Sequence, residues 1–286
     1  MLKKVVRKAS EMAYKLQSSA QLDKLLQEID PQAQQLGQAI KATFSKTISP
    51  EEQPFIERIE ALRHQMETSD ESMTVMDFGA GKRTDTLTDE EMYQGRTKTL
   101  TVAAACSHSK PPEWALLLFK LVREFKPKAL VEMGTNVGIS ASYQASALKL
   151  NGDGGRLMTL EGAEALADLS QRNFHSLGLD NVRCVVGRFQ DTLDGVLEEL
   201  RPLDYAFIDG HHEEKATINY FHQILPYTAP TALMIFDDIN WNEGMHNAWE
   251  TIIAHERVDL AVEMEEIGIC VVRPTKVSTK RLYKIY

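Results

Sequence analysis

The sequence predicts an α/β protein with a doubly wound, mostly parallel sheet and an N-terminal helical extension. Downstream of Lys128, apolar runs of strand length alternate with helical patterns and short links, a pattern typical of parallel βαβ units. The first run ends in a turn with two glycines, Glu132-Met133-Gly134-Thr135-Asn136-Val137-Gly138, as expected at the ligand-binding edge of an open sheet. Residues 1–110 lack this alternation and form the predicted extension with a lid-like loop. Residues 111–286 form the predicted α/β domain.

The predicted elements follow from hydrophobic periodicity and from Pro and Gly positions. Strands are expected at 129–133, 156–161, 182–186, 203–208, 231–236 and 267–272, and helices at 138–150, 163–177, 190–200, 213–225 and 242–256. In the extension, one helical run ends at Pro31, and Ser49-Pro50 opens a second helix to about Met66. Pro111-Pro112 opens an apolar helix to Phe125. The loop 79–96 is expected to cover the site or to form a dimer surface.

Composition argues against several classes of protein. The formal net charge of −9 over 286 residues disfavours a general nucleic-acid binder, which would be basic. No apolar run approaches the roughly 20 residues that span a bilayer, and no apolar signal region follows the basic start at 1–8. The three cysteines, Cys106, Cys184 and Cys270, suit a reducing compartment. We therefore expect a cytoplasmic protein without stable membrane insertion.

The glycine turn points to a nucleotide-like ligand. Gly134 allows a turn where a Cβ would clash, Gly138 allows close approach of a ligand, and Glu132 can accept hydrogen bonds from it. The order E-x-G-x-x-x-G lacks the third glycine of the dinucleotide fingerprint, which disfavours NAD or FAD. Glu161 ends the next strand, where an acid can bind both ribose hydroxyls; alternatively it is a helix N-terminal acid favoured by the dipole.

Three carboxylates end two further strands. Asp209 follows one apolar run, and Asp237 and Asp238 follow the next. Because parallel strands end at the same edge of a sheet, these side chains should converge beside the glycine turn. A hard divalent cation such as Mg²⁺ would relieve their repulsion. The alternative is that Asp237 and Asp238 cap the helix near Trp241 and stay solvated.

At these residues the chain resembles the class I S-adenosylmethionine-dependent methyltransferases, whose fold is Rossmann-like. The runs 185–191, 203–212 and 234–238 (VVGRFQD, LDYAFIDGHH and MIFDD) resemble the catechol O-methyltransferase group. They resemble still more closely the relatives of macrocin O-methyltransferase. The resemblance covers about residues 112–272. It implies S-adenosylmethionine as cofactor, with Glu161 at its ribose and with Gly162 and Asp209 also among the residues that bind it.

The resemblance also implies roles for other side chains. Phe189 and Gln190 would contact adenine, and Asn136 and Ser140 would lie near the methionine portion. Their position alone explains Phe189 and Gln190 equally well, as a core residue and a polar residue at the start of a helix. Apart from the resemblance, His108 lies in a loop just before the predicted α/β domain and is a candidate for contact with cofactor or substrate.

In the resembling group, Asp, Asp and Asn hold the metal. Here the Asn position is Asp238, an added negative charge. A metal at Asp209, Asp237 and Asp238 would lower the pKa of a substrate hydroxyl, and His212 would act as base, with His211 as its alternative.

The resulting interpretation is an S-adenosylmethionine-dependent O-methyltransferase that uses Mg²⁺ and methylates a hydroxyl of a small metabolite. The acceptor could be aromatic or secondary, and a homodimer through the N-terminal region is possible. One alternative is a metal-independent N- or O-methyltransferase with a His base. Another is a cofactor-binding protein without catalytic activity.

Overall fold

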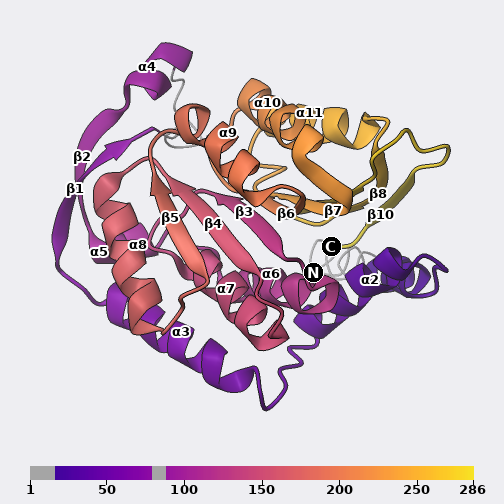
Figure 1. Ribbon diagram of the computed structural model, residues 1–286, viewed down its shortest axis with the longest axis horizontal. Coiled ribbons are helices and arrows are strands. Elements are labelled where there is room, and N and C mark those ends of the chain that lie inside the picture. The colour runs from indigo at the N-terminus through magenta and orange to yellow at the C-terminus, as the bar shows by residue number, and fades with distance from the viewer. Residues whose placement is uncertain (1–16, 79–87) are drawn as a thin grey trace, which may run out of the picture.

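The central feature of the computed structural model, which describes residues 17–78 and 88–286, is a mostly parallel sheet (Figure 1). In the described residues its strand order is β10-β8-β9-β7-β6-β3-β4-β5. The strands are β3 (Ala129–Met133), β4 (Arg156–Glu161), β5 (Val182–Val186), β6 (Leu203–Ile208), β7 (Thr228–Phe236), β8 (Val258–Glu263), β9 (Gly268–Val272) and β10 (Arg281–Lys284). Strand β9 runs antiparallel to β7 and β8, and β10 runs parallel to β8. The predicted fold class is confirmed, and all six predicted strands are present.

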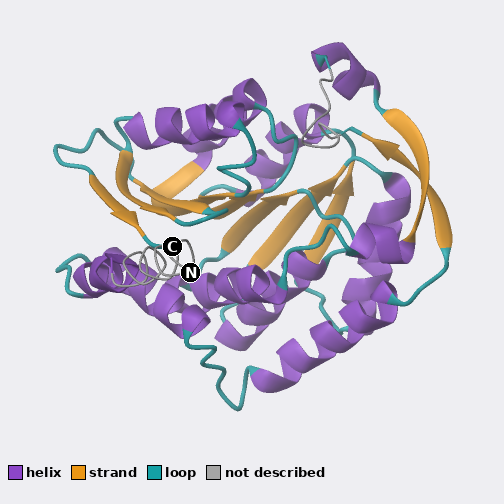
Figure 2. Cartoon of the chain, turned by 180° about the vertical axis from the view of Figure 1, so that it is seen from behind, coloured by secondary structure: helices purple, strands orange, loops and turns teal. Residues whose placement is uncertain are grey.

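Helices cover both faces of this sheet (Figure 2). On one face lie α6 (Pro112–Phe125), α7 (Ile139–Asn151) and α8 (Glu164–Ser176). On the other lie α9 (Phe189–Leu200), α10 (Glu214–Ile224), the short 3₁₀ turn η1 (Leu225–Tyr227) and α11 (Glu243–Ala254). Neighbouring residues of β3 alternate between the two cores: Leu130 joins the first and Val131 the second. A fully buried parallel strand has this two-sided apolar character.

The N-terminal extension is an outer layer on the face of α6 and α7. Residues 17–26 are helical, and α2 (Pro31–Phe44) and α3 (Gln53–Glu67) follow. Leu36, Ile40 and Ile59 belong to the same buried core as α6 and α7. Pro31 both follows the first helix and begins the next, with the Asp30 side chain capping α2. The helix predicted from Pro50 begins instead at Gln53, and Glu52 is its N-cap residue.

A separate two-stranded sheet, β1 (Ser72–Asp77) and β2 (Arg96–Thr101), closes one side of the molecule (Figure 1). The short helices α4 (Asp89–Gln94) and α5 (Val102–Cys106) flank β2. The predicted lid loop thus begins outside the described residues, at 79–87, and ends in α4 and β2. The basic start of the chain also lies outside them. Strands β2, β8 and β10 were not predicted, and β2 and β10 are too polar to give a strand signal.

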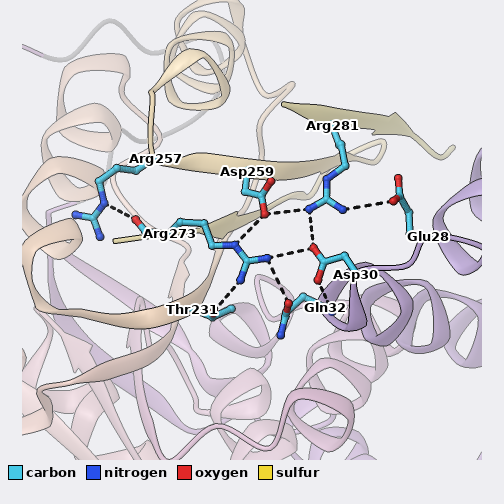
Figure 3. Close-up of polar contacts among 8 residues, drawn as sticks. All are labelled: Glu28, Asp30, Gln32, Thr231, Arg257, Asp259, Arg273 and Arg281. Carbon is cyan, nitrogen blue, oxygen red and sulfur yellow. Dashed lines mark hydrogen bonds and ion pairs between the residues drawn. The ribbon is translucent and has the colours of Figure 1, made fainter. Parts of the chain in front are cut away.

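An ion-pair network joins the start of α2 to the edge of the sheet (Figure 3). Asp30 accepts from Arg273 at 3.1 Å and from Arg281 at 2.6 Å. Asp259 of β8 accepts from the same two guanidinium groups at 2.8 and 2.9 Å. Segments from both ends of the chain are therefore held together at one edge of the sheet. No helix in the described ranges has the length and apolar character needed to cross a bilayer.

Candidate active site

A cavity of about 310 Å³ opens at the carboxyl ends of the central strands. Its walls come from the turns after β3, β4 and β6, from the start of α9, and from the β1–β2 hairpin. The predicted site residues that line it are Gly134, Asn136, Glu161, Gly162, Phe189, Gln190, His108, His211 and His212. The sequence motifs from separate βα turns therefore meet around one cavity, as the topology of an open α/β sheet requires.

The glycine turn after β3 needs its two glycines. Gly134 has φ +102°, and a Cβ there would overlap the Asp209 carbonyl oxygen. Gly138 has φ +85°, and a Cβ there would meet the Phe174 ring at 2.7 Å. Both backbone conformations are strained for residues with a side chain. The turn therefore packs against the β6 turn, which brings Asp209 beside it.

Glu161 connects two loops of the cavity wall. Its Oε2 accepts from the Asn136 backbone N–H at 2.8 Å, and its Oε1 accepts from that of Ala163 at 2.9 Å. Burial raises its pKa despite these hydrogen bonds. Glu161 lines the cavity, and its carboxylate holds the turn after β3 to the turn after β4. Its contact with ribose hydroxyls stays a prediction.

Glu132 lies beneath the turn, away from the cavity walls. It is fully buried, and its carboxylate accepts from Ser140 Oγ at 2.5 Å and Gln144 Nε2 at 2.8 Å. Burial raises its pKa to about 8. Neither Glu132, Gly138 nor Ser140 lines the cavity. In this structure Glu132 and Ser140 join β3 to α7, and their direct contact with a cofactor stays a prediction.

An aromatic cluster forms another wall. The Phe189 ring, at the start of α9, lies edge-on to the rings of His211 and Tyr220. The distance between ring centroids is 6.0 Å in both pairs. Tyr220 Oη and His211 Nδ1 share a hydrogen bond of 2.6 Å. Phe189 therefore faces the cavity with support behind it, a geometry suited to a flat ring such as adenine. His211 is therefore part of this wall, through its hydrogen bond to Tyr220 and its contact with Phe189.

The β1–β2 hairpin supplies a wall that the sequence motifs did not indicate. Phe78 packs against Gly162, where a Cβ would lie 2.6 Å from its ring. Lys98 pairs with Asp77 across the hairpin at 2.8 Å. All three lining residues, Phe78, Lys98 and Asp77, precede the methyltransferase-like region. The sequence of this segment has a strand-like run at 73–78, but such a run indicates no chemistry.

The three predicted acids converge at the ends of β6 and β7, and a lysine lies among them. Lys110 Nζ contacts Asp237 Oδ2 and lies 3.6 Å from Asp209 Oδ2. The Asp237 side chain is fully buried, and that of Lys110 is 10% exposed. His212 lies between the other two acids, with Nε2 3.9 Å from Asp209 Oδ1 and Nδ1 3.4 Å from Asp238 Oδ2. No sequence motif indicated Lys110.

The charges of Lys110 and of the acid cluster (Asp209, Asp237 and Asp238) act on one another. Burial acts to lower the pKa of Lys110, but the three carboxylates together raise it well above its usual value, so the side chain is an ammonium. Burial and the charge of Asp237 raise the pKa of Asp209.

The cluster does not fit a divalent ion as it is arranged. The ammonium contacts Asp237 Oδ2, an oxygen that the predicted metal would need. Within residues 17–78 and 88–286, no group of three or more His, Cys, Asp or Glu side chains has the geometry of a metal site. One buried oxygen, Asp237 Oδ1, lacks a hydrogen-bond donor. The acids meet as predicted, whereas magnesium there stays a prediction.

Known proteins with a similar sequence or fold are methyltransferases. A family model described as "Methyltransferase domain" matches residues 131–239. A catechol O-methyltransferase of Niastella koreensis is 29% identical over 153 residues, covering 53% of this chain and 67% of the relative. The solved O-methyltransferase of Bacillus cereus, in complex with SAH, is 26% identical with a TM-score of 0.50, covering 58% of this chain and 83% of that one. TomG of Streptomyces achromogenes, at 21% identity and a TM-score of 0.50 over 58% and 82% of the two chains, shows the same fold.

The fold, the motifs around the cavity and these relatives show a class I S-adenosylmethionine-dependent methyltransferase that resembles the catechol O-methyltransferase group. It is an enzyme, an S-adenosylmethionine-dependent O-methyltransferase. The family model matches residues 131–239, from β3 to the turn after β7. The β1–β2 hairpin and the N-terminal layer precede this range.

Proposed function

We propose that the enzyme transfers the methyl group of S-adenosylmethionine to a hydroxyl of a small metabolite bound at the acid cluster. The observation that supports this is the position of His212. It lines the cofactor cavity and also lies within 4 Å of Asp209 and Asp238. One side chain thus faces both the cavity that would hold the sulfonium and the polar edge that would hold an acceptor.

The reaction needs three things from the protein. The ribose and adenine are held by Glu161 and by the Phe189 wall, so that the sulfonium methyl points to the acid cluster. The acceptor oxygen attacks this methyl, forming an O–CH₃ bond while the S–CH₃ bond breaks, and S-adenosylhomocysteine leaves. The hydroxyl proton passes to His212, the proposed base. Alignment of the two reactants supplies a large part of the rate enhancement.

The other predicted residues have supporting roles in this proposal. His211, bonded to Tyr220, braces the adenine wall, and His108 lines the cavity near the glycine turn. If magnesium binds, Asp209, Asp237 and Asp238 would be its ligands, and it would acidify the acceptor hydroxyl. Lys110 contacts Asp237 Oδ2, an oxygen that the metal would need. The steps above are therefore written without a metal.

The acceptor is proposed to be a small hydroxylated compound. The catechol in the name of the Niastella koreensis relative makes phenols and catechols the first candidates. An amine acceptor at the same cluster would give N-methylation, and a cofactor-binding protein without activity would give no product. Methyl transfer from labelled S-adenosylmethionine to paired hydroxyl and amine compounds distinguishes these outcomes.

The first prediction concerns His212→Gln. Loss of the base should lower kcat by about 10²- to 10⁴-fold, while calorimetry should show nearly unchanged affinity for S-adenosylmethionine. His175→Gln, in the last turn of α8, is the matched control and should have neither effect. Unchanged kcat in His212→Gln would reject His212 as base. Failure of the wild-type protein to bind S-adenosylmethionine, with NAD as reference, would reject the site itself.

A further inference from the structure

The acid cluster receives its positive charge from a distant part of the chain. Lys110 lies in the link between α5 and α6, just before Pro111, the N-cap residue of α6. Its ammonium contacts Asp237 and lies 3.6 Å from Asp209. The side chain is nine-tenths buried, so this position is built into the fold and is not a solvent-exposed ion pair.

The chemistry of the cluster explains why a cation belongs there. Three carboxylates at the ends of adjacent strands repel one another, and burial increases the repulsion. Glu266, after β8, adds a fourth acid whose pKa is raised by burial and by Asp237 and lowered by Lys110. An ammonium is a compact charge with three N–H donors, so it can satisfy carboxylate oxygens and still present an N–H to a substrate oxygen.

We propose that Lys110 is the built-in cation of this active site, and that its ammonium takes the place at Asp237 and Asp209 where the sequence predicts a divalent metal. Asp237 and Asp209 hold the ammonium, and the acceptor oxygen is bound against it. The part of this proposal that concerns the acceptor rests on the proposed O-methyl transfer. The part that concerns metal binding does not.

Two properties follow. The wild-type enzyme binds divalent ions at this cluster weakly, because a metal would have to displace a buried ammonium from Asp237. Its methyl transfer persists in a chelator. Removing the ammonium without changing the carboxylates leaves Asp237 and Asp209 without its positive charge. Carboxylate oxygens are the ligands that hard divalent ions bind. The variant Lys110→Met should therefore gain metal affinity.

The experiment is a titration of the 286-residue chain with Mn²⁺ in the absence of any acceptor. The electron paramagnetic resonance signal of the free ion measures binding. We expect Lys110→Met and Lys110→Gln to bind Mn²⁺ at least about tenfold more tightly than wild type, because each variant loses a positive charge within 4 Å of Asp209 and Asp237. Lys128→Met, which removes an exposed lysine paired with Asp153 at 3.0 Å, is the matched control and should gain nothing.

Several results would overturn the proposal. These are tight Mn²⁺ binding by wild type that Asp237→Asn abolishes, equal affinities of wild type and both Lys110 variants, or loss of wild-type activity in a chelator with recovery on adding Mg²⁺. Circular dichroism and calorimetry with S-adenosylmethionine check that each variant is folded; if neither Lys110 variant folds, the wild-type titration with Asp237→Asn decides. Because metal binding is measured without turnover, a failure to find an O-methylated product leaves this result intact.

Discussion

Glu132 shows how one residue in the cofactor motif can act through the protein interior. It is completely buried between β3 and α7, with Ser140 Oγ and Gln144 Nε2 as its hydrogen-bond partners. Burial raises its pKa to about 8, so it carries a proton near neutral pH. A neutral carboxyl group here can both donate and accept. The residue therefore anchors the helix that begins at the glycine turn.

Substituting Glu132→Gln should change the pH dependence of stability. Between its usual pKa of 4.5 and the folded value of about 8, the folded protein holds a proton that the unfolded chain has lost. Wild-type stability should thus fall as pH rises through this window, by up to about 1.4 kcal/mol per pH unit. The neutral Gln side chain should remove this slope. Urea unfolding from pH 5 to 8 measures it.

Glu164→Gln, on the exposed first turn of α8, provides the control and should keep the wild-type slope. Equal slopes in Glu132→Gln and wild type would show that Glu132 is ionised in the folded protein.

Among the elements, α2 depends most clearly on one side chain at its N-terminus. Asp30 caps the helix by accepting from the Gln32 backbone N–H, and also accepts from Arg273 and Arg281. Burial acts to raise its pKa, but these hydrogen bonds and charges outweigh it, so the pKa is lowered. Asp30 thereby couples the helix start to strand β10 at the far end of the chain.

Replacing Asp30 by Ala should destabilise the protein by about 1–2 kcal/mol, the range for loss of an N-cap with a partly buried ion pair. Because the folded pKa is lowered, this contribution is present above the usual value of 3.8 and is lost as pH falls through the folded pKa. The difference between wild type and Asp30→Ala in chemical unfolding should therefore shrink below about pH 4. Asp70→Ala, at an exposed position before β1, should leave stability within about 0.5 kcal/mol; an equal loss there would contradict the capping role.

Across the whole molecule, the N-terminal extension and the α/β sheet share one core. Leu36 and Ile40 of α2 are fully buried in the cluster that also holds residues of α6, α7 and β3. The predicted division at residue 110 therefore follows the sequence motifs but crosses a continuous packed interior. A homodimer through this region stays a prediction, which size-exclusion chromatography with light scattering would test.

Because the core is shared, Leu36→Ala should lower the free energy of unfolding of the entire protein by about 2–5 kcal/mol. In a background in which Trp114 and Trp241 are replaced by Phe, the fluorescence of Trp249, buried on the opposite face of the sheet, and far-UV circular dichroism should report the same shifted midpoint. Ile29→Ala, at a side chain that is 95% exposed, should leave the midpoint in place. Separate transitions for the two probes in Leu36→Ala would instead indicate that the extension unfolds on its own.

Local patterns in the sequence determined the α/β fold, the glycine turn and the acids at the strand ends. Alternation of strand and helix restricts the chain to a parallel sheet, and a parallel sheet brings the ends of its strands to one edge. Gly134, Glu161 and Asp209 could thus be placed near one another from their positions after apolar runs.

Only the tertiary structure decided what faces those residues. Lys110 and the β1–β2 hairpin come from segments that precede the sheet, and no spacing rule relates them to Asp237 or Gly162. The same holds for β10, whose polar residues become a strand beside β8. Such contacts depend on the packing of distant segments around a common core, a property that local periodicity does not encode. The cation beside the acids was accordingly predicted as a metal, whereas the fold places the ammonium of Lys110 there.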